Sequence, residues 1–195
     1  MITQKRFFLK KVLKSYKKFI KGYLLDVGGP SNFDKDYYNL SSCISLNLND
    51  LEVKTNVIAD VEEMPFADNT FDTILFIEAL PCLKVTNFEK SLSECMRVLK
   101  PGGFIFVSTL FTHIIAEEDF DIHRHTKTSA KQLFEKYKIF EIRELGYLGS
   151  FLHSYLWEIT NKSKLILWCR PFFSLIDKLT VNKRFCSGHL FVLKK

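Results

Sequence analysis

The stretch Tyr23–Asn32, YLLDVGGPSN, constrains most strongly how this chain can fold. A short apolar run, Tyr23–Leu25, leads into Asp26 and then into a turn that contains Gly28 and Gly29. Glycine has no Cβ and accepts positive φ, so backbone N–H groups in such a turn can approach a ligand closely. The pattern predicts a buried strand that ends in a ligand-binding turn. Asp26 favours a ligand with an ammonium or sulfonium group over a pyrophosphate.

Composition indicates one globular domain. The 195 residues allow a sizeable core, and 47% hydrophobic with 26% charged residues is typical of globular proteins. The five cysteines are odd in number and lack CxxC spacing, which argues against a disulfide framework and a zinc site and suits a reducing cytoplasm. Neither a signal peptide nor an apolar run of about 18 residues is visible. We expect a single cytoplasmic domain over residues 1–195, with no metal.

The net charge of +6 is concentrated near the N-terminus, because residues 1–21 hold eight basic side chains and no acid. Among them, Leu9, Leu13, Tyr16 and Ile20 fall at helical spacing, which predicts a basic amphipathic helix over residues 1–21. Such a helix could pack on a sheet with its lysines in water. It could also lie on anionic lipid or contact nucleic acid. The packed arrangement is favoured, and the others stay open.

The next elements are unusually close together. Only fifteen residues, 28–42, separate the first strand from the apolar run Cys43–Leu48. Parallel strands need a crossover of about a dozen residues, so at most one short helix fits, around Phe33–Leu40. The third run, Thr55–Ala59, follows with no room for a helix. Asn47 stands at the end of the second strand.

A fourth strand, a third helix and a fifth strand are expected next. The block IADVEEMPFADNTFDTILFIEAL holds Asp60 and Met64, and its apolar run Phe71–Ile77 predicts a fully buried strand. An amphipathic helix is expected over Asn87–Leu99. It should stop at Lys100-Pro101-Gly102-Gly103, before a fifth strand over Phe104–Ser108.

These motifs together resemble the class I S-adenosylmethionine-dependent methyltransferases, with a type 11-like methyltransferase domain. The resemblance rests on Asp-x-Gly-Gly after the first strand, the block from Ile58 to Leu80, and RVLKPGGFIFVS. It implies a Rossmann-like, doubly wound α/β fold whose mostly parallel seven-stranded sheet has a final antiparallel strand, His189–Leu193, beside the fifth. It implies S-adenosyl-L-methionine as cofactor, with cofactor-binding residues at Asp26, Gly28, Gly29, Asn47, Asp60, Val61, Met64 and Glu78.

Several positions depart from the family pattern. Asn47 stands where the family has a ribose-binding acid, Pro30 replaces its second glycine, and Pro81-Cys82 replaces an expected histidine. Asn47 could contact the ribose or simply end a strand, Asp60 could instead cap a helix, and Met64 could be a core residue. A non-catalytic binding or scaffold protein is therefore the alternative. A nicotinamide-dependent oxidoreductase is disfavoured, because G-x-G-x-x-G is missing.

The segment TLFTHIIAEEDFDIHRHT, beyond the fifth strand, holds three histidines and four acids. His113 and His123 are the candidate catalytic bases, because imidazole titrates near neutral pH. A metal site or a solvated polar loop would also explain the cluster. Asp121–Thr126 resembles a lid segment in a methyltransferase branch linked to glycan and secondary-metabolite pathways.

A last segment, 149–183, is apolar and aromatic-rich and exceeds what the core fold needs. It follows a helix over Lys127–Tyr137, capped by Thr126 or Thr128, and a sixth strand over Ile139–Leu145. Arg170-Pro171 interrupts it, which predicts two short helices. They could add to the core, form an acceptor pocket or a dimer face, or contact a membrane surface.

The function implied is methyl transfer by in-line displacement to a small-molecule or glycan-precursor acceptor. The signature that grips a nucleobase amine, Asn/Asp-Pro-Pro-aromatic, is absent, so we expect no stable nucleic-acid partner. The protein should be cytoplasmic, with peripheral membrane contact as an open possibility. The oligomeric state stays open.

Overall fold

The computed structural model describes residues 4–29, 35–48, 55–77, 85–111, 123–161, 163–181 and 186–195. Pro30, Glu78, Pro81-Cys82 and His113 therefore lie outside the described residues. The described strands form one seven-stranded sheet of order β3-β2-β1-β4-β5-β7-β6. The strands are β1 (Gly22–Val27), β2 (Leu40–Asn47), β3 (Val57–Ile58), β4 (Phe71–Phe76), β5 (Leu99–Leu110), β6 (Lys138–Leu145) and β7 (Gly188–Lys194).

Strand directions confirm the expected doubly wound α/β fold. Strands β1 to β5 run parallel to one another, whereas β7 is antiparallel to both β5 and β6. The last strand is thus inserted beside the fifth, as the resemblance implied. Because β5 and β6 both oppose β7, they end at the same edge of the sheet, which is also the edge where β1, β2 and β4 end.

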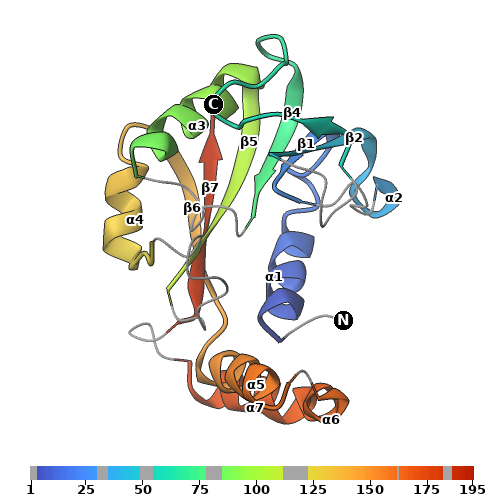
Figure 1. Ribbon diagram of the computed structural model, residues 1–195, viewed down its shortest axis with the longest axis vertical. Helices are drawn as coiled ribbons and strands as arrows, with labels where there is room; N and C mark the ends of the chain where they lie inside the picture. The colour runs from blue at the N-terminus through green and yellow to red at the C-terminus, as the bar shows by residue number, and fades with distance from the viewer. Residues whose placement is uncertain are drawn as a thin grey trace.

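Helices cover both faces of the sheet (Figure 1). They are α1 (Gln4–Ser15), α2 (Lys35–Tyr38), α3 (Val85–Val98), α4 (Lys127–Leu133), α5 (Leu148–Ile159), α6 (Lys164–Trp168) and α7 (Arg170–Leu179). One core cluster joins α3 and α4 to one face, and a second joins α1 and α2 to the other. Side chains alternate between the two faces along β5, so this strand contributes to both clusters. Ile105 and Val107 belong to the first cluster, and Phe104 and Phe106 belong to the second.

The basic N-terminal segment packs on the sheet. Leu9, Leu13, Tyr16 and Ile20 are buried in the second cluster, while the lysines between them are exposed. The regular helix ends at Ser15, and turns continue the chain to Phe19. The lysine side chains thus remain on the outer surface of α1.

The segment after β6 differs from the prediction of two helices, because the described residues form three, α5, α6 and α7. The first break falls at Thr160–Asn161, where Asn161 has φ of 50°. The second break falls where it was expected, because α6 ends at Trp168 and α7 begins at Arg170. Pro171 lies in the first turn of α7, where its missing N–H breaks no helical hydrogen bond. In the described part of the chain, no helix is long and apolar enough to cross a membrane.

Helices α5 and α7 are joined by a buried carboxylate. Asp177 of α7 accepts hydrogen bonds from the backbone N–H groups of Tyr147, at 3.1 Å, and Ser150, at 2.8 Å, in the first turn of α5. These N–H groups have no partner within a helix, so the carboxylate replaces a capping side chain. Gly149 allows this contact, because a Cβ there would overlap the Phe173 carbonyl oxygen.

We therefore expect Asp177→Ala to lower the free energy of unfolding by about 2–3 kcal/mol, because two buried N–H groups lose their acceptor. Denaturant titration of the full chain measures the change. Lys178→Ala, at the exposed neighbouring position, is the matched control and should stay within about 0.5 kcal/mol of the parent. An equal effect of both variants would contradict the capping role.

Candidate functional site

The candidate site lies at the edge of the sheet that is formed by the C-terminal ends of the parallel strands. Val27 pairs with Leu46, and Asn47 pairs with Ile58, so the ends of β1, β2 and β3 lie side by side. Asp26, Asn47 and Asp60 stand at or just beyond these ends. Ligands of open α/β sheets bind in the crevice outside the carboxyl ends of the strands. The predicted binding residues that the structure describes are therefore brought to one edge.

Asp26 is the buried acid of this edge. It is 5% exposed, and burial raises the pKa of its carboxyl to about 7. An ionised carboxylate in this position lacks the solvation that water would give it, so the fold favours the protonated form. A cationic group of a ligand placed beside it would reverse that preference. The site thus has an electrostatic reason to bind a positively charged group.

The two glycines are required by the turn above Asp26. Gly28 has φ of 76°, and its N–H donates to the Leu46 carbonyl oxygen at 2.8 Å, which extends the β1–β2 ladder. A Cβ on Gly29 would overlap the Asp26 carboxyl group. The backbone of Gly29 can therefore lie directly on the carboxyl only because it carries no side chain.

Asn47, the last residue of the neighbouring strand β2, is hydrogen-bonded to the glycine turn. Its Nδ2 donates to the Gly29 carbonyl oxygen at 3.1 Å and to Thr55 Oγ1 at 3.0 Å. Both amide protons are thus engaged within the protein, and Oδ1 is the atom left to accept from a ligand hydroxyl. This role, a clamp between the glycine turn and the start of the β3 segment, was missed by the sequence analysis. A carboxylate at this position could not donate either bond.

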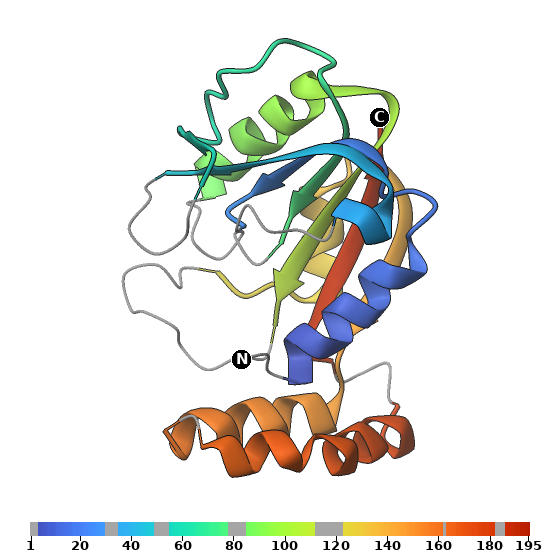
Figure 2. The ribbon, with the colours of Figure 1, turned by 90° about the vertical axis from the view of Figure 1, so that its right-hand side faces the viewer.

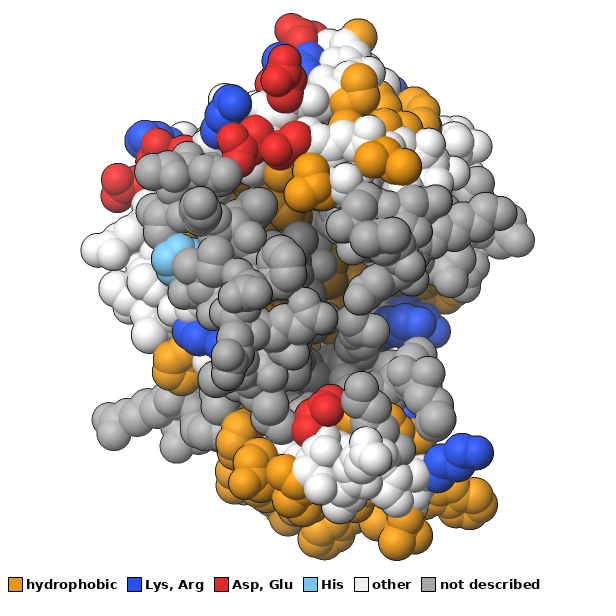
Figure 3. Space-filling model, in the orientation of Figure 1, with side chains coloured by type: hydrophobic (Ala, Val, Ile, Leu, Met, Phe, Trp, Pro, Cys, Tyr) orange, Lys and Arg blue, Asp and Glu red, His pale blue; other side chains and the backbone are white. Residues whose placement is uncertain are grey.

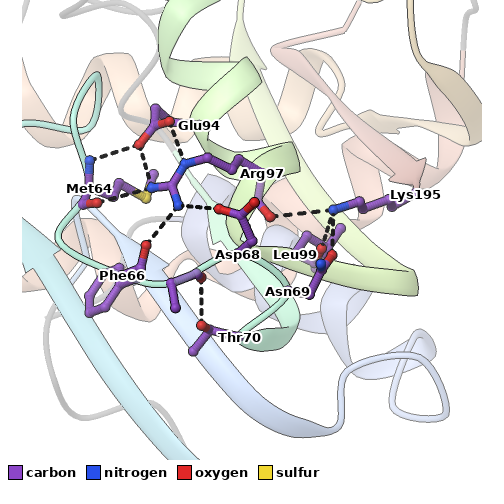
Figure 4. A network of polar contacts seen from close by, with 10 residues as sticks. Met64, Phe66, Asp68, Asn69, Thr70, Glu94, Arg97, Leu99 and Lys195 are labelled. Atoms are coloured by element: carbon purple, nitrogen blue, oxygen red, sulfur yellow. Dashed lines mark hydrogen bonds and ion pairs between the residues drawn. The ribbon is translucent and has the colours of Figure 1, made fainter.

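The segment after β3 is held by α3. Arg97 donates to the Met64 and Phe66 carbonyl oxygens, at 3.1 and 2.8 Å, and pairs with Glu94 and Asp68 (Figure 4). Glu94 also accepts from the Met64 N–H at 3.0 Å. These bonds fix the loop between β3 and β4 against the helix, and so fix the position of Asp60 beside the sheet edge.

Asp60, Val61 and Met64 have different environments. Asp60 is exposed, and its Oδ1 accepts from the Glu62 N–H at 2.9 Å, which forms a local turn rather than a helix cap. Val61 and Met64 are 9% and 4% exposed and belong to the core cluster that also holds Val27 and Leu46. Their side chains mainly support the strand ends, so contact with a ligand would be limited to their outer atoms.

Two described histidines, His123 and His125, follow β5 in the chain. The rings of His123 and His125 have centroids 5.9 Å apart, and the His125 N–H donates to the Leu110 carbonyl oxygen at 2.9 Å. This bond holds the pair at the end of β5. Burial, with His123 nearby, lowers the pKa of His125. His123 is half-buried and is therefore the more accessible of the two.

His189 is a further histidine of this edge that the sequence analysis did not select. It is 3% exposed and lies on β7, opposite Thr109 of β5 on one side and Glu144 of β6 on the other. Its Nε2 lies 3.2 Å from Cys186 Sγ, and burial lowers its pKa. Within the described part of the chain, its Nδ1 has no hydrogen-bond partner. The sequence signal that could have identified it is its position at the start of the last strand, which the resemblance placed beside the fifth strand.

The donor set of the edge fits a cofactor such as S-adenosylmethionine. A buried carboxyl beneath two glycines suits its cationic end, the Asn47 oxygen suits a hydroxyl, and the exposed carboxylate of Asp60 can accept from an amine. Among the described residues, no group of three or more His, Cys, Asp or Glu side chains could hold a metal ion.

Comparison with known proteins supports this assignment. A family model described as "Methyltransferase domain" matches residues 34–107. The "Uncharacterized protein MJ0638" of Methanocaldococcus jannaschii is 31% identical over 161 residues, which cover 78% of this chain and 68% of that protein. The "Ubiquinone/menaquinone biosynthesis C-methyltransferase UbiE" of Idiomarina loihiensis is 49% identical over 51 residues, 26% of this chain. That match spans 20% of the length of UbiE.

Solved structures show the same fold at low sequence identity. A SAM-dependent methyltransferase from Archaeoglobus fulgidus superposes with a TM-score of 0.62 at 17% identity, covering 96% of this chain and 93% of that one. The "[4+2]-Cyclase SpnF" has a TM-score of 0.66 at 15% identity, covering 96% of this chain and 79% of that one. These two proteins are named for different activities, so the fold alone does not assign one.

The buried acid makes a prediction for stability. The pKa of Asp26 is about 7 in the folded protein and 3.8 in its ordinary state, so between these values the folded state holds a proton that the unfolded chain has lost. Stability is therefore lost as pH rises through this window and is constant above it. Asp26→Asn lacks this titration, so its free energy of unfolding should rise relative to that of the parent as pH increases across the same window, by up to about 4 kcal/mol.

Denaturant titrations of both proteins at several pH values measure this difference. Glu135→Gln provides the matched acid-to-amide control at an exposed position. A difference between Asp26→Asn and the parent that does not change with pH would contradict the buried, protonated carboxyl.

Proposed function

We propose, on the premise that this chain belongs to the class I S-adenosylmethionine-dependent methyltransferases, that it transfers a methyl group from S-adenosylmethionine to a small-molecule acceptor. The observation that carries the proposal is Asp26, buried beneath the Gly28-Gly29 turn at the end of β1. It supplies a site for a cationic ligand in the place where the fold binds its ligands.

The chain's own residues have separable roles in this proposal. Asp26 neutralises the positive end of the cofactor, Asn47 accepts from a hydroxyl while it clamps the turn, and Asp60 accepts from the adenine amine. Glu78, Val61 and Met64 complete the cofactor-binding set. When bound, the cofactor supplies an electrophilic methyl group on a sulfonium. The protein then needs only to hold the acceptor in line, so orientation provides much of the rate.

Proton removal from the acceptor requires a base at the end of β5. His123 is the described candidate, since it is half-buried beside His125. His113 is the second candidate from the sequence and lies outside the described residues. An unprotonated imidazole can accept a proton from an acceptor hydroxyl, phenol or acidic carbon at neutral pH.

We favour an acceptor with an apolar body. The curated proteins that match segments of this chain include methyltransferases named for ubiquinone and menaquinone biosynthesis, for phthiotriol dimycocerosates and for a sterol 4-carbon. All of these names denote molecules with a largely apolar body. A glycan precursor is the other acceptor class that the sequence suggested, and a panel of both classes distinguishes them.

A non-catalytic binding protein of the same fold is the second candidate function. Asn47 favours it, because an uncharged amide replaces the acid expected at the ribose. Both N–H donors of this amide already form hydrogen bonds within the protein. This alternative predicts weak or absent cofactor binding. Methyl transfer predicts binding that depends on the Asp26 charge.

Calorimetric titration with S-adenosylhomocysteine tests the proposal. The parent should bind in the micromolar range, and Asp26→Asn should bind at least about tenfold more weakly, because a charge-assisted contact is lost. Asp26→Asn keeps the side-chain shape and is expected to be the more stable protein above pH 7, so unfolding would not explain the loss. No binding by the parent at millimolar ligand would favour the non-catalytic alternative.

His123→Asn should lower the rate of methyl transfer by about 10²-fold or more, with S-adenosylhomocysteine affinity unchanged, if His123 removes the acceptor proton. Transfer of labelled methyl from S-adenosylmethionine to a panel of phenols, quinols, sterols and sugar nucleotides measures this rate. His125→Asn is the matched control in the same segment. Equal rates for the parent and His123→Asn would remove His123 from the mechanism.

A further inference from the structure

A row of exposed apolar side chains runs along one side of α6 and α7. It consists of Leu165, Trp168, Phe172, Leu175 and Leu179, which are between 52% and 84% exposed. Within α6 and within α7, their spacing of three and four residues places them on one face of that helix. We call this row the α6–α7 stripe. Figure 3 shows apolar side chains gathered on this helical part of the surface.

The stripe is not the face with which these helices pack. Helix α7 turns its buried residues, Phe173 and Asp177, toward α5, where Asp177 holds the first turn of α5. The stripe lies on another side, so burying it would not disturb the contact between α5 and α7. Monomeric soluble proteins rarely expose a continuous apolar surface of this kind without a binding role.

The exposed charged side chains of α6 and α7 have one sign. Lys164 and Lys178 flank it and are exposed, and the Arg170 guanidinium lies over the Phe7 ring at 5.6 Å. The acids of the described part of α5–α7 are Asp177, which is buried, and Glu158 on α5. Helix α1 packs against α5 and α7 and adds exposed lysines, including Lys10 and Lys11, to the adjoining surface.

We propose that the α6–α7 stripe docks this protein on an anionic membrane surface, with the two helices lying in the plane of the interface. An apolar face with flanking lysines and an exposed tryptophan has the chemistry of an interfacial helix, because tryptophan and lysine side chains both favour the headgroup region. Membrane attachment of this kind requires no spanning helix. The inference concerns binding alone and does not depend on methyl transfer.

The charge pattern favours anionic lipid over a second copy of this chain. A symmetric dimer would place the same surface on both partners. Lys164 and Lys178 would then face their own copies or the apolar stripe, with no exposed acid of α6 or α7 among the described residues to pair with them. Lipid phosphates supply the missing negative charge.

Docking would bring the candidate site to the membrane. Helix α5 begins at Leu148, directly after β6, and β6 ends at the same sheet edge as β5. Figure 2 shows α5 and α7 lying beyond this end of β5. The stripe therefore belongs to the side of the molecule on which Asp26 and His125 stand, and an acceptor dissolved in lipid would be close by.

Flotation of the full chain with vesicles tests the proposal. The protein should float with vesicles of equimolar phosphatidylcholine and phosphatidylglycerol and remain unbound with phosphatidylcholine alone. Trp168→Ser combined with Leu175→Ser should reduce the bound fraction about tenfold or more, because two inserted apolar side chains are lost. Ile58→Ser, at an exposed isoleucine of β3, is the matched control and should bind like the parent.

Charge reversal and fluorescence separate insertion from adsorption. Lys164→Glu combined with Lys178→Glu, or high salt, should weaken binding several-fold. The chain has two tryptophans, and Trp157 is buried, so a blue shift of emission with anionic vesicles should come from Trp168. Circular dichroism of each variant excludes unfolding as the cause.

Three outcomes would overturn the proposal. The parent could fail to float with either vesicle, or the Trp168/Leu175 variant could float like the parent. In the third outcome, sedimentation would show that the parent is a dimer and that the Trp168/Leu175 variant is a monomer, while neither protein binds vesicles. The stripe would then be an interface between copies of this chain.

Discussion

A carboxyl group lying directly beneath a two-glycine turn is the constraint on which the candidate site depends. Asp26 is excluded from water by the same backbone that a ligand must approach, since Gly29 lies on the carboxyl with no side chain between them. Burial favours the protonated acid, and a cation would favour the ionised one. The fold therefore keeps the carboxyl neutral until a cationic ligand stabilises its ionised form, and this is the basis on which we expect the site to select the sign of its ligand.

The remaining structure keeps this turn in place and positions other groups beside it. Asn47 ties the turn to the β3 segment, and Arg97 ties the following loop to α3. Parallel strands bring these groups to one edge without any of them being adjacent in sequence. The inserted strand β7 adds His189 to the same edge, and the helices after β6 extend beyond it. The residues proposed for cofactor binding, for proton removal and for membrane docking thus belong to neighbouring parts of one side of the molecule.

Much of the fold could be predicted because its signals are local. Glycine turns, uninterrupted apolar runs and helical spacing located the strands and main helices, and the Thr126 cap accepts from the Ser129 N–H as expected. One of the two breaks within residues 149–183 could be predicted and the other could not. The break at Arg170-Pro171 was expected and separates α6 from α7, whereas no proline marks the additional break at Thr160–Asn161, between α5 and α6.

The candidate site was predictable only in part, because its contacts join residues distant in sequence. Asp26 and the glycines follow from a single turn, whereas the two bonds of Asn47 depend on Gly29 and Thr55 meeting across β2. The orientation of Met64 toward the core depends on Glu94 and Arg97, which stand thirty residues further along. His189 reaches the edge only because β7 is inserted beside β5.

The proton balance of cofactor binding tests the central claim most directly. At pH 6 the Asp26 carboxyl, with a pKa of about 7, is mostly protonated, and a cationic ligand should expel that proton. Calorimetric titration with S-adenosylmethionine, which carries both an ammonium and a sulfonium group, in buffers of different ionisation enthalpy measures the number of protons released. We expect close to one proton per molecule bound at pH 6 and close to none at pH 8.5. Binding without proton release at pH 6 would contradict the account, because the cation would then lie elsewhere.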